Sequence, residues 1–218
     1  MAKILIFGVK DLAELAHFYF QHDSSHEVCG FSVNEKYIKE TTFNKLPVIP
    51  FENIETEFPP SDYLFFVPTN ATKMNKERER IYHETMNKGY DFASYISSKA
   101  TVLTDKIGDN CFIFEDNTIQ PFTQIGNNVI LWSGNHIGHH SVIKDHVFIT
   151  SHVVISGNCV INSYSYLGVN SAVKENSILA EGTFVAMGTS ITANTEPYGV
   201  YKDISTTKMN MSSMNLRF

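Results

Sequence analysis

The sequence predicts a β protein with an α/β N-terminal domain: a parallel β-helix of six-residue repeats, preceded by a small Rossmann-like parallel sheet. Three observations predict this fold. An aliphatic residue occupies every sixth position from Ile107 to Ile191 without a slip, and the fifth residue of most repeats is small. Before residue 98, short apolar runs alternate with helical patterns, which is typical of a small open parallel sheet.

A period of six residues fits neither one face of an α-helix nor an alternating strand, and it is the signature of a parallel β-helix. Each repeat is expected to form one short strand and one corner. Three repeats then complete a turn, and residues eighteen apart stack at the ordinary strand spacing of roughly 4.8 Å. A large side chain at the fifth position would overpack the narrow interior. A β-sandwich is the alternative fold, but fifteen unbroken repeats disfavour it. The aliphatic residues of these repeats are Ile107, Ile113, Ile119, Ile125, Leu131, Ile137, Ile143, Ile149, Ile155, Ile161, Leu167, Val173, Leu179, Val185 and Ile191.

The N-terminal elements follow from apolar runs and their flanking residues. A helix is expected to begin at Asp11, with Leu12, Leu15, Ala16 and Phe20 on its inner face. A second helix is expected to end before Gly89, where a C-cap belongs. The predicted strands span residues 3–9, 26–33, 46–51, 62–67 and 90–96, and the second predicted helix spans 71–88.

Composition shifts divide the chain into three parts. Residues 1–97 are the predicted Rossmann-like domain, residues 98–196 the β-helix and residues 197–218 a C-terminal tail. Pro197 and Gly199 break the six-residue period. Because the last coil exposes unpaired strand edges, we expect the tail either to cover that end or to be mobile over its final dozen residues.

Composition also limits the function. The chain has 218 residues and a mean hydropathy of -0.13, as expected for a soluble globular chain. Its net charge of -6 argues against nucleic-acid binding. No apolar stretch approaches the length of a transmembrane helix. Three cysteines do not make a disulfide framework. Cys111 and Cys159 occupy small fifth positions and Cys29 lies in an apolar run, so packing explains all three. A cytoplasmic location is expected.

Five of the nine histidines fall within seventeen residues: His136, His139, His140, His146 and His152. Each is open to interpretation as a surface residue, an interface residue or a metal ligand. A zinc site like that of the β-helical carbonic anhydrases needs a pair of histidines five residues apart and a third about two coils earlier. No pair here is five apart, and the residue two coils before His139 is Leu103. No metal site is therefore expected.

The repeat pairs His139 with Gly157. His139 is the third residue of its repeat, and the equivalent residue on the next coil, eighteen positions later, is Gly157. Imidazole is the natural general base near neutral pH. A glycine lets a ligand carbonyl approach a backbone N–H closely, as an oxyanion donor requires. The pair therefore suits acyl transfer from a thioester.

The turn after the first strand, Gly8-Val9-Lys10-Asp11, is the usual ligand position of a small parallel sheet. Backbone N–H groups at the start of the following helix suit a phosphate, and Lys10 adds a positive charge. Taken alone this signal is weak, since most such turns bind nothing.

Several motifs carry a resemblance to a known family. They are Ser94-Tyr95-Ile96-Ser97, Ile137-Gly138-His139-His140-Ser141, Ser156-Gly157 and Val200-Tyr201-Lys202. With the small N-terminal domain, they make the chain resemble the sialic-acid O-acetyltransferase-like sugar acyltransferases, which include the N-acetyltransferases of nucleotide-linked amino sugars.

The resemblance implies a left-handed β-helix and a homotrimer with active sites between subunits. It implies an acetyl-CoA-dependent acetyltransferase that acts on the amino group of a nucleotide-linked amino sugar by direct attack. His139 matches the general base. Gly157 and Met187 match residues that contact acetyl-CoA. The nucleotide sugar is expected at Gly8, Val9, Lys10, Asn34 and Glu35. A sugar O-acetyltransferase and a non-catalytic binding or assembly module are the alternatives.

The sequence departs from the family at three positions. Asp11 stands where relatives have a later glycine of the phosphate loop, and Phe148 stands where some have a second histidine. His140 stands where relatives often have the acidic residue that orients the base. We assign His140 to the catalytic site with His139, and what orients His139 stays open.

Overall fold

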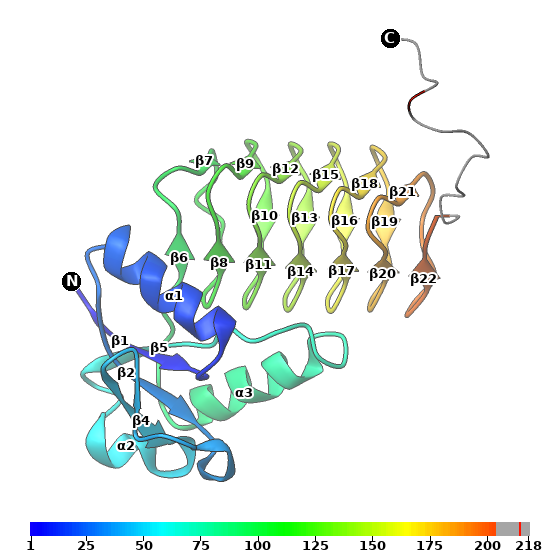
Figure 1. The fold of residues 1–218 in the computed structure, drawn as a ribbon. Helices are drawn as coiled ribbons and strands as arrows, with labels where there is room; N and C mark the ends of the chain where they lie inside the picture. The colour runs from blue at the N-terminus through cyan, green and yellow to red at the C-terminus, as the bar shows by residue number, and fades with distance from the viewer. Residues whose placement is uncertain (204–213, 215–218) are drawn as a thin grey trace.

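The computed structural model describes residues 1–203 and Met214. It consists of a long triangular prism and a small α/β domain packed along one side of it (Figure 1). The remaining residues of the predicted C-terminal tail lie outside the described residues, so the expectation that the tail's final dozen residues are mobile is not addressed. No described helix combines the length and the apolar character that crossing a bilayer requires.

The small domain is a five-stranded sheet with strand order β3-β4-β2-β1-β5, parallel throughout except for the hairpin of β3 and β4. Its first strand, β1, is buried on both faces, as expected for a central parallel strand. Its elements are β1 (Lys3–Phe7), α1 (Asp11–His22), β2 (Glu27–Val33), η1 (Glu35–Tyr37), β3 (Thr42–Phe43), β4 (Leu46–Pro50), η2 (Phe51–Asn53), α2 (Ile54–Glu57), β5 (Tyr63–Phe66) and α3 (Lys76–Asn87).

Two N-terminal predictions were wrong. The second helix begins at Lys76 and not at residue 71, because Lys73, Met74 and Asn75 have positive φ angles that an α-helix does not allow. Residues 90–96 do not form the last strand of the small sheet. Only Phe92 bridges to β5, and the chain then leaves the sheet to form β6 (Tyr95–Ile96), the first strand of the prism.

The prism has three walls of parallel two-residue strands. Wall 1 contains β22-β20-β17-β14-β11-β8-β6, wall 2 contains β21-β18-β15-β12-β9-β7 and wall 3 contains β10-β13-β16-β19. The strands are β6 (Tyr95–Ile96), β7 (Thr101–Val102), β8 (Phe112–Ile113), β9 (Thr118–Ile119), β10 (Gln124–Ile125), β11 (Ile130–Leu131), β12 (His136–Ile137), β13 (Val142–Ile143), β14 (Phe148–Ile149), β15 (Val154–Ile155), β16 (Val160–Ile161), β17 (Tyr166–Leu167), β18 (Ala172–Val173), β19 (Ile178–Leu179), β20 (Phe184–Val185), β21 (Ser190–Ile191) and β22 (Val200–Tyr201).

The register is the one that the repeat predicts. Ile137, for example, pairs with Ile119 on one side and Ile155 on the other, each eighteen residues away. The aliphatic residues that recur every six positions fill the interior together with small fifth residues such as Cys111 and Cys159. The pairing of Phe184 with Val200 shows that the last coil is two residues shorter than the others. Tyr201 packs against the interior residues.

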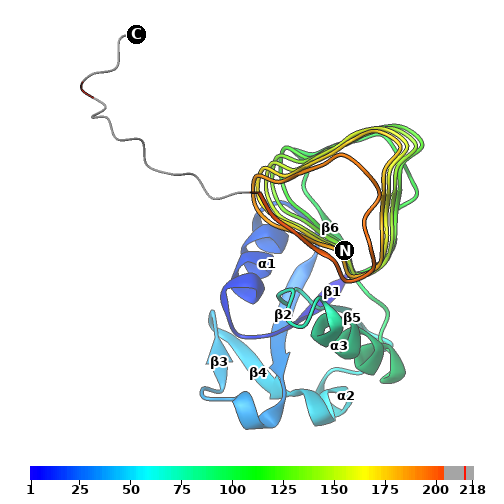
Figure 2. The same ribbon diagram turned by 90° about the vertical axis from the view of Figure 1, so that its right-hand side faces the viewer.

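The small domain covers wall 1 and the corner between walls 3 and 1 (Figure 2). Phe66 of β5 meets Phe112 of wall 1 edge-on, with ring centroids 5.2 Å apart. On the corner, α3 supplies Tyr82, whose hydroxyl donates to Asp109 over 2.7 Å. Asp23, after α1, accepts hydrogen bonds from Tyr95, Ser97 and Ser98, and these bonds hold the connecting segment against the small domain.

Candidate active site

His139 lies at the corner between walls 2 and 3, directly over Gly157 of the next coil. A Cβ atom built on Gly157 would lie 2.6 Å from Cε1 and 2.8 Å from Nε2 of the His139 ring. Any larger residue at 157 would therefore displace the imidazole. The backbone N–H of His139 donates to Oε1 of Gln120 over 2.9 Å. The predicted stacking of His139 on Gly157 is confirmed.

His140 shares this corner and contacts His139 through the ring nitrogens. The two Nδ1 atoms lie 3.1 Å apart, and the ring planes are nearly perpendicular at 86°. His140 has a φ angle of 59°, in the left-handed region. Its other face meets the exposed ring of Phe122, with centroids 4.7 Å apart. Sequence reasoning missed Gln120 and Phe122, although the eighteen-residue period places Phe122 under His140.

Gly157 offers a backbone donor beside the imidazole. Its carbonyl accepts a hydrogen bond from the N–H of Asn176 over 3.1 Å, and no described residue accepts one from its own N–H. Some other third residues share that free N–H, whereas the N–H groups of Asp109, Asn127 and His139 donate to side chains. What distinguishes Gly157 is the imidazole above it. A carbonyl oxygen bound at its N–H would therefore lie beside a general base.

The predicted nucleotide loop follows β1 at the carboxyl edge of the small sheet. Gly8 has a φ angle of 111°, which strains any residue with a Cβ, and its N–H donates to Ser32 on neighbouring β2. Lys10 is the exposed N-cap of α1, and no described residue accepts a hydrogen bond from the N–H of Asp11 or Leu12. These N–H groups suit an anion at the start of α1. The carboxylate of Asp11 at the same turn opposes one.

Asn34 and Glu35 follow β2, which neighbours β1, so they lie at the same edge of the sheet as the loop. Both hold Glu52. The Asn34 amide donates to Oε1 over 3.1 Å, and the Glu35 N–H donates to Oε2 over 2.9 Å. Burial raises the pKa of the Glu52 carboxyl, but hydrogen bonds from Glu35, from its own backbone and from Asn34, together with the charge of Lys88, outweigh burial and lower the pKa overall. Sequence reasoning missed Glu52, which lies seventeen residues from Glu35 and carries no motif.

Met187 does not join His139 and Gly157 within one chain. It follows β20 of wall 1 and lies at the corner between walls 1 and 2, whereas His139 and Gly157 follow strands of wall 2. Its side chain is 72% exposed. A role for Met187 beside Gly157 therefore requires a second copy of the chain.

Three side chains between α3 and the prism have metal-ligand chemistry: Glu79, His83 and His146. The hydrogen bonds of His146 disfavour the binding of a metal ion by these three side chains. The Val67 N–H donates to Oδ1 of Asn110, the Asn110 amide donates to Asn128, and the Asn128 amide contacts Nδ1 of His146 over 2.9 Å. A backbone N–H only donates, so this order makes Nδ1 the acceptor and leaves the proton on Nε2, the nitrogen that faces Glu79. Burial lowers the pKa of His146 to about 4.

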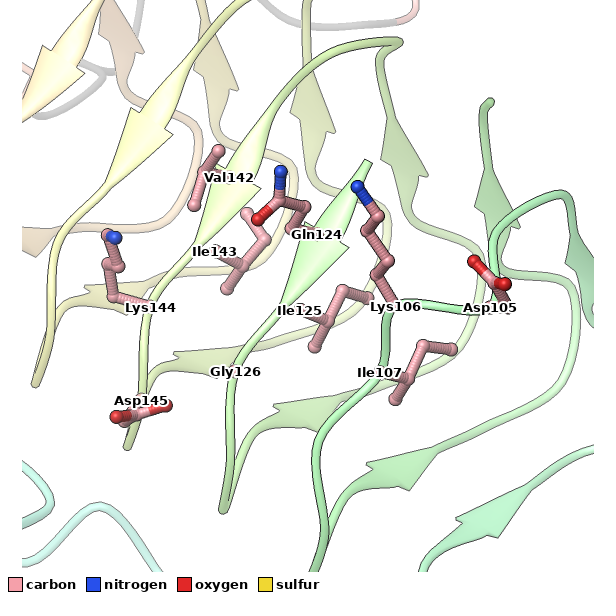
Figure 3. Close-up of a pocket in the computed structure, with 10 residues that line it drawn as sticks. All are labelled: Asp105, Lys106, Ile107, Gln124, Ile125, Gly126, Val142, Ile143, Lys144 and Asp145. Carbon is pink, nitrogen blue, oxygen red and sulfur yellow. The ribbon is translucent and has the colours of Figure 1, made fainter. Parts of the chain in front are cut away.

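A shallow hollow of about 360 Å³ lies on wall 3. Lys106 and Lys144 project at its rim, with Asp105 and Asp145 nearby (Figure 3). Neither His139 nor Gly157 lines this hollow, and His139 and His140 are exposed at their corner of the single chain.

Comparison with known proteins supports the predicted resemblance. Residues 106–139 and 122–157 match the bacterial transferase hexapeptide family (six repeats). Comparison with curated protein sequences finds no match.

Solved structures share the fold over nearly the whole chain. A variant of perosamine N-acetyltransferase from Caulobacter crescentus, in complex with CoA and GDP-perosamine, has a TM-score of 0.81 at 14% identity, covering 92% of this chain and 93% of that one. The acetyltransferase domain of PglB from Neisseria gonorrhoeae has a TM-score of 0.76 at 17% identity, and WeeI from Acinetobacter baumannii 0.76 at 18%; each match covers 92% of this chain and 96% of the other. The predicted fold, a left-handed parallel β-helix after a Rossmann-like sheet, is confirmed.

Proposed function

We propose that the protein transfers an acetyl group from acetyl-CoA to the amino group of a nucleotide-linked amino sugar. The observation that carries this proposal is the His139 imidazole stacked on Gly157, with a free backbone N–H beside a general base. The fold is shared with sugar acetyltransferases, and one of those structures holds CoA and GDP-perosamine.

Each group has a defined task in the transfer. Nε2 of His139 accepts a proton from the sugar amine as the nitrogen attacks the thioester carbonyl. The N–H of Gly157 donates to the oxygen of the tetrahedral intermediate, where negative charge develops. The C–S bond then breaks, the amide forms, and the proton passes from His139 to the leaving CoA sulfur. His139 is thus neutral at the start and at the end.

The site is a composite of two copies. The small domain, which carries Gly8, Lys10 and Asn34, covers wall 1, whereas His139 lies at the corner between walls 2 and 3, opposite wall 1. One chain therefore holds its nucleotide loop and its base on opposite sides of the prism. The homotrimer that the family resemblance implies brings the loop of one copy to the base of the next.

The first experiment measures thiol release from acetyl-CoA with dTDP-, UDP- and GDP-linked amino sugars, and identifies the product by mass spectrometry. We expect an amide product that resists mild base. An ester that mild base cleaves would indicate O-acetylation instead. Absence of acetyl-CoA binding by calorimetry would contradict the proposal and favour a binding or assembly module.

Mixed oligomers test the composite site. His139→Ala is expected to lower turnover by roughly a thousandfold, and Lys10→Glu is expected to abolish nucleotide binding by repelling phosphate. Co-expression of the two variants would restore activity, because some sites would combine an intact Lys10 from one copy with an intact His139 from another. No restoration would show that each site is built within one chain. His152→Ala, at another exposed corner histidine, is the matched control and should keep full activity.

A further inference from the structure

His139 needs a fixed tautomer to act as a base. Its ring carries one proton when neutral, and only a proton on Nδ1 leaves the lone pair of Nε2 free. A hydrogen-bond acceptor at Nδ1 selects that tautomer, as a carboxylate does in many histidine sites. Among the described residues the only partner at this nitrogen is Nδ1 of His140, at 3.1 Å.

We propose that His140 is the positioning residue for His139, accepting the Nδ1–H of His139 on its own Nδ1. The proposal rests on the proposed function for its catalytic consequence, but the hydrogen bond itself is a property of the resting protein. His140 also contacts Phe122 of the preceding coil, with ring centroids 4.7 Å apart, and its backbone has the left-handed φ of 59°.

An imidazole differs from a carboxylate in this position because it also donates. The hydrogen bond between the two Nδ1 atoms has two directions, and only the one in which His139 donates leaves Nε2 of His139 free. In the other direction His140 donates and the proton of His139 sits on Nε2. A carboxylate only accepts, so it permits the productive direction alone. The pair therefore sets a lower fraction of active base than a histidine–carboxylate pair.

The residues of the neighbouring coils that flank the two imidazoles do not titrate. The coil before the pair contributes Pro121 and Phe122, and the coil after it contributes Gly157 and Asn158, none of which titrates. No salt bridge among residues 1–203 involves His139 or His140. Glu175, which follows Gly157 by one further coil, is the next charged group along the His139 column.

Three substitutions at 140 separate the possible roles. Oδ1 of Asp or Asn is bonded to Cγ just as Nδ1 of His is, so His140→Asp and His140→Asn keep an acceptor at the same place. His140→Phe keeps the ring and removes the acceptor. His152→Phe is the control, because His152 is also an exposed fourth residue, with a φ of 59°, and it contacts neither His139 nor His140.

Nitrogen-15 NMR of histidine-labelled protein reads the tautomer without any substrate. In His140→Asp we expect the His139 proton to move fully to Nδ1, and in His140→Phe we expect it to move toward Nε2. The wild type should lie between them, and His152→Phe should match the wild type. Identical His139 shifts in the wild type and His140→Phe would overturn the proposal.

The pH–rate profile gives the catalytic readout. We expect His140→Phe to lower kcat by roughly tenfold or more with little change in KM, and His140→Asn to restore most of it. His140→Asp should raise the kcat plateau at high pH by about twofold, because a carboxylate permits one hydrogen-bond direction where the imidazole of His140 permits two. Its carboxylate also stabilises the imidazolium, so its acid limb should move to higher pH. An unchanged profile in all three variants would refute the positioning role.

The two proposals fail in different ways. If no acceptor takes an acetyl group from acetyl-CoA, the proposed function is wrong, and the NMR comparison still decides whether His140 sets the tautomer. If transfer occurs and His140→Phe keeps the wild-type kcat and profile, the function stands and the role of His140 is wrong.

Discussion

His140 and His146 occupy neighbouring corners of the same prism in the same backbone conformation, with φ angles of 59° and 62°. Each is the fourth residue of its repeat. His140 is exposed and contacts another imidazole. His146 is 7% exposed under α3, receives a hydrogen bond from Asn128, and has its pKa lowered to about 4 by burial.

The difference comes from what covers each corner and not from the repeat. The corner between walls 3 and 1 is covered by α3, so its polar side chains must satisfy one another, and they do so along the column from Asn110 to His146. The corner between walls 2 and 3 is uncovered in the single chain, so its imidazoles stay available to a ligand. The repeat supplies equivalent backbone positions. Whether another element covers a corner determines whether its histidine is buried in a hydrogen-bonded column or open to a ligand.

Removing the amide at each corner is expected to give the largest contrast in stability. Asn128→Ala leaves the Asn110 amide and Nδ1 of His146 without a partner in a buried place, which should cost about 3 kcal/mol of unfolding free energy. Asn158→Ala, at the same repeat position of the open corner, loses only the preference of Asn for a left-handed φ, about 1 kcal/mol. Urea unfolding of both variants measures the difference. Equal losses would show that the buried column adds nothing.

Two glycine substitutions separate the chemistry of the open corner from the stability of the prism. A methyl group at Gly157 meets the exposed His139 ring, which moves aside, so Gly157→Ala should lower kcat/KM by about a hundredfold with little loss of stability. A methyl group at Gly138 meets the backbone of Ser156 and Gly157 within 2.7 Å and should destabilise the prism itself. Kinetics and thermal unfolding of the two variants separate these effects. Full activity of Gly157→Ala would remove Gly157 from the site.

The pH dependence of stability tests the buried corner by a different route. The pKa of His146 is about 4 in the folded chain, below the 6.5 of a free histidine, so the unfolded chain binds more protons between these values and stability falls as the pH drops through that window. Between pH 7.5 and pH 5 the loss should be about 2 kcal/mol. His146→Gln should remove that part of the pH dependence, and an unchanged dependence would contradict the assignment.

Much of the prism was predictable from the sequence because its restraint is local and repeated. One aliphatic residue in six, from Ile107 to Ile191, sets the strands, the corners and the register, and a slip of one residue would turn the whole interior row outward. The period also placed His139 over Gly157. The small domain was less predictable at its edges, since the left-handed run before α3 and the departure of Tyr95 into the prism depend on contacts with distant residues.

Which residues stack on which follows from the sequence alone, because a six-residue period converts distance along the chain directly into position in space. Three features could be seen only in three dimensions: which corners are covered, the bonds of Asn34 and Glu35 to Glu52, and the contact of His140 with His139. Those outcomes depend on where the small domain docks and on how single side chains turn at a corner. No period in the sequence encodes either of them.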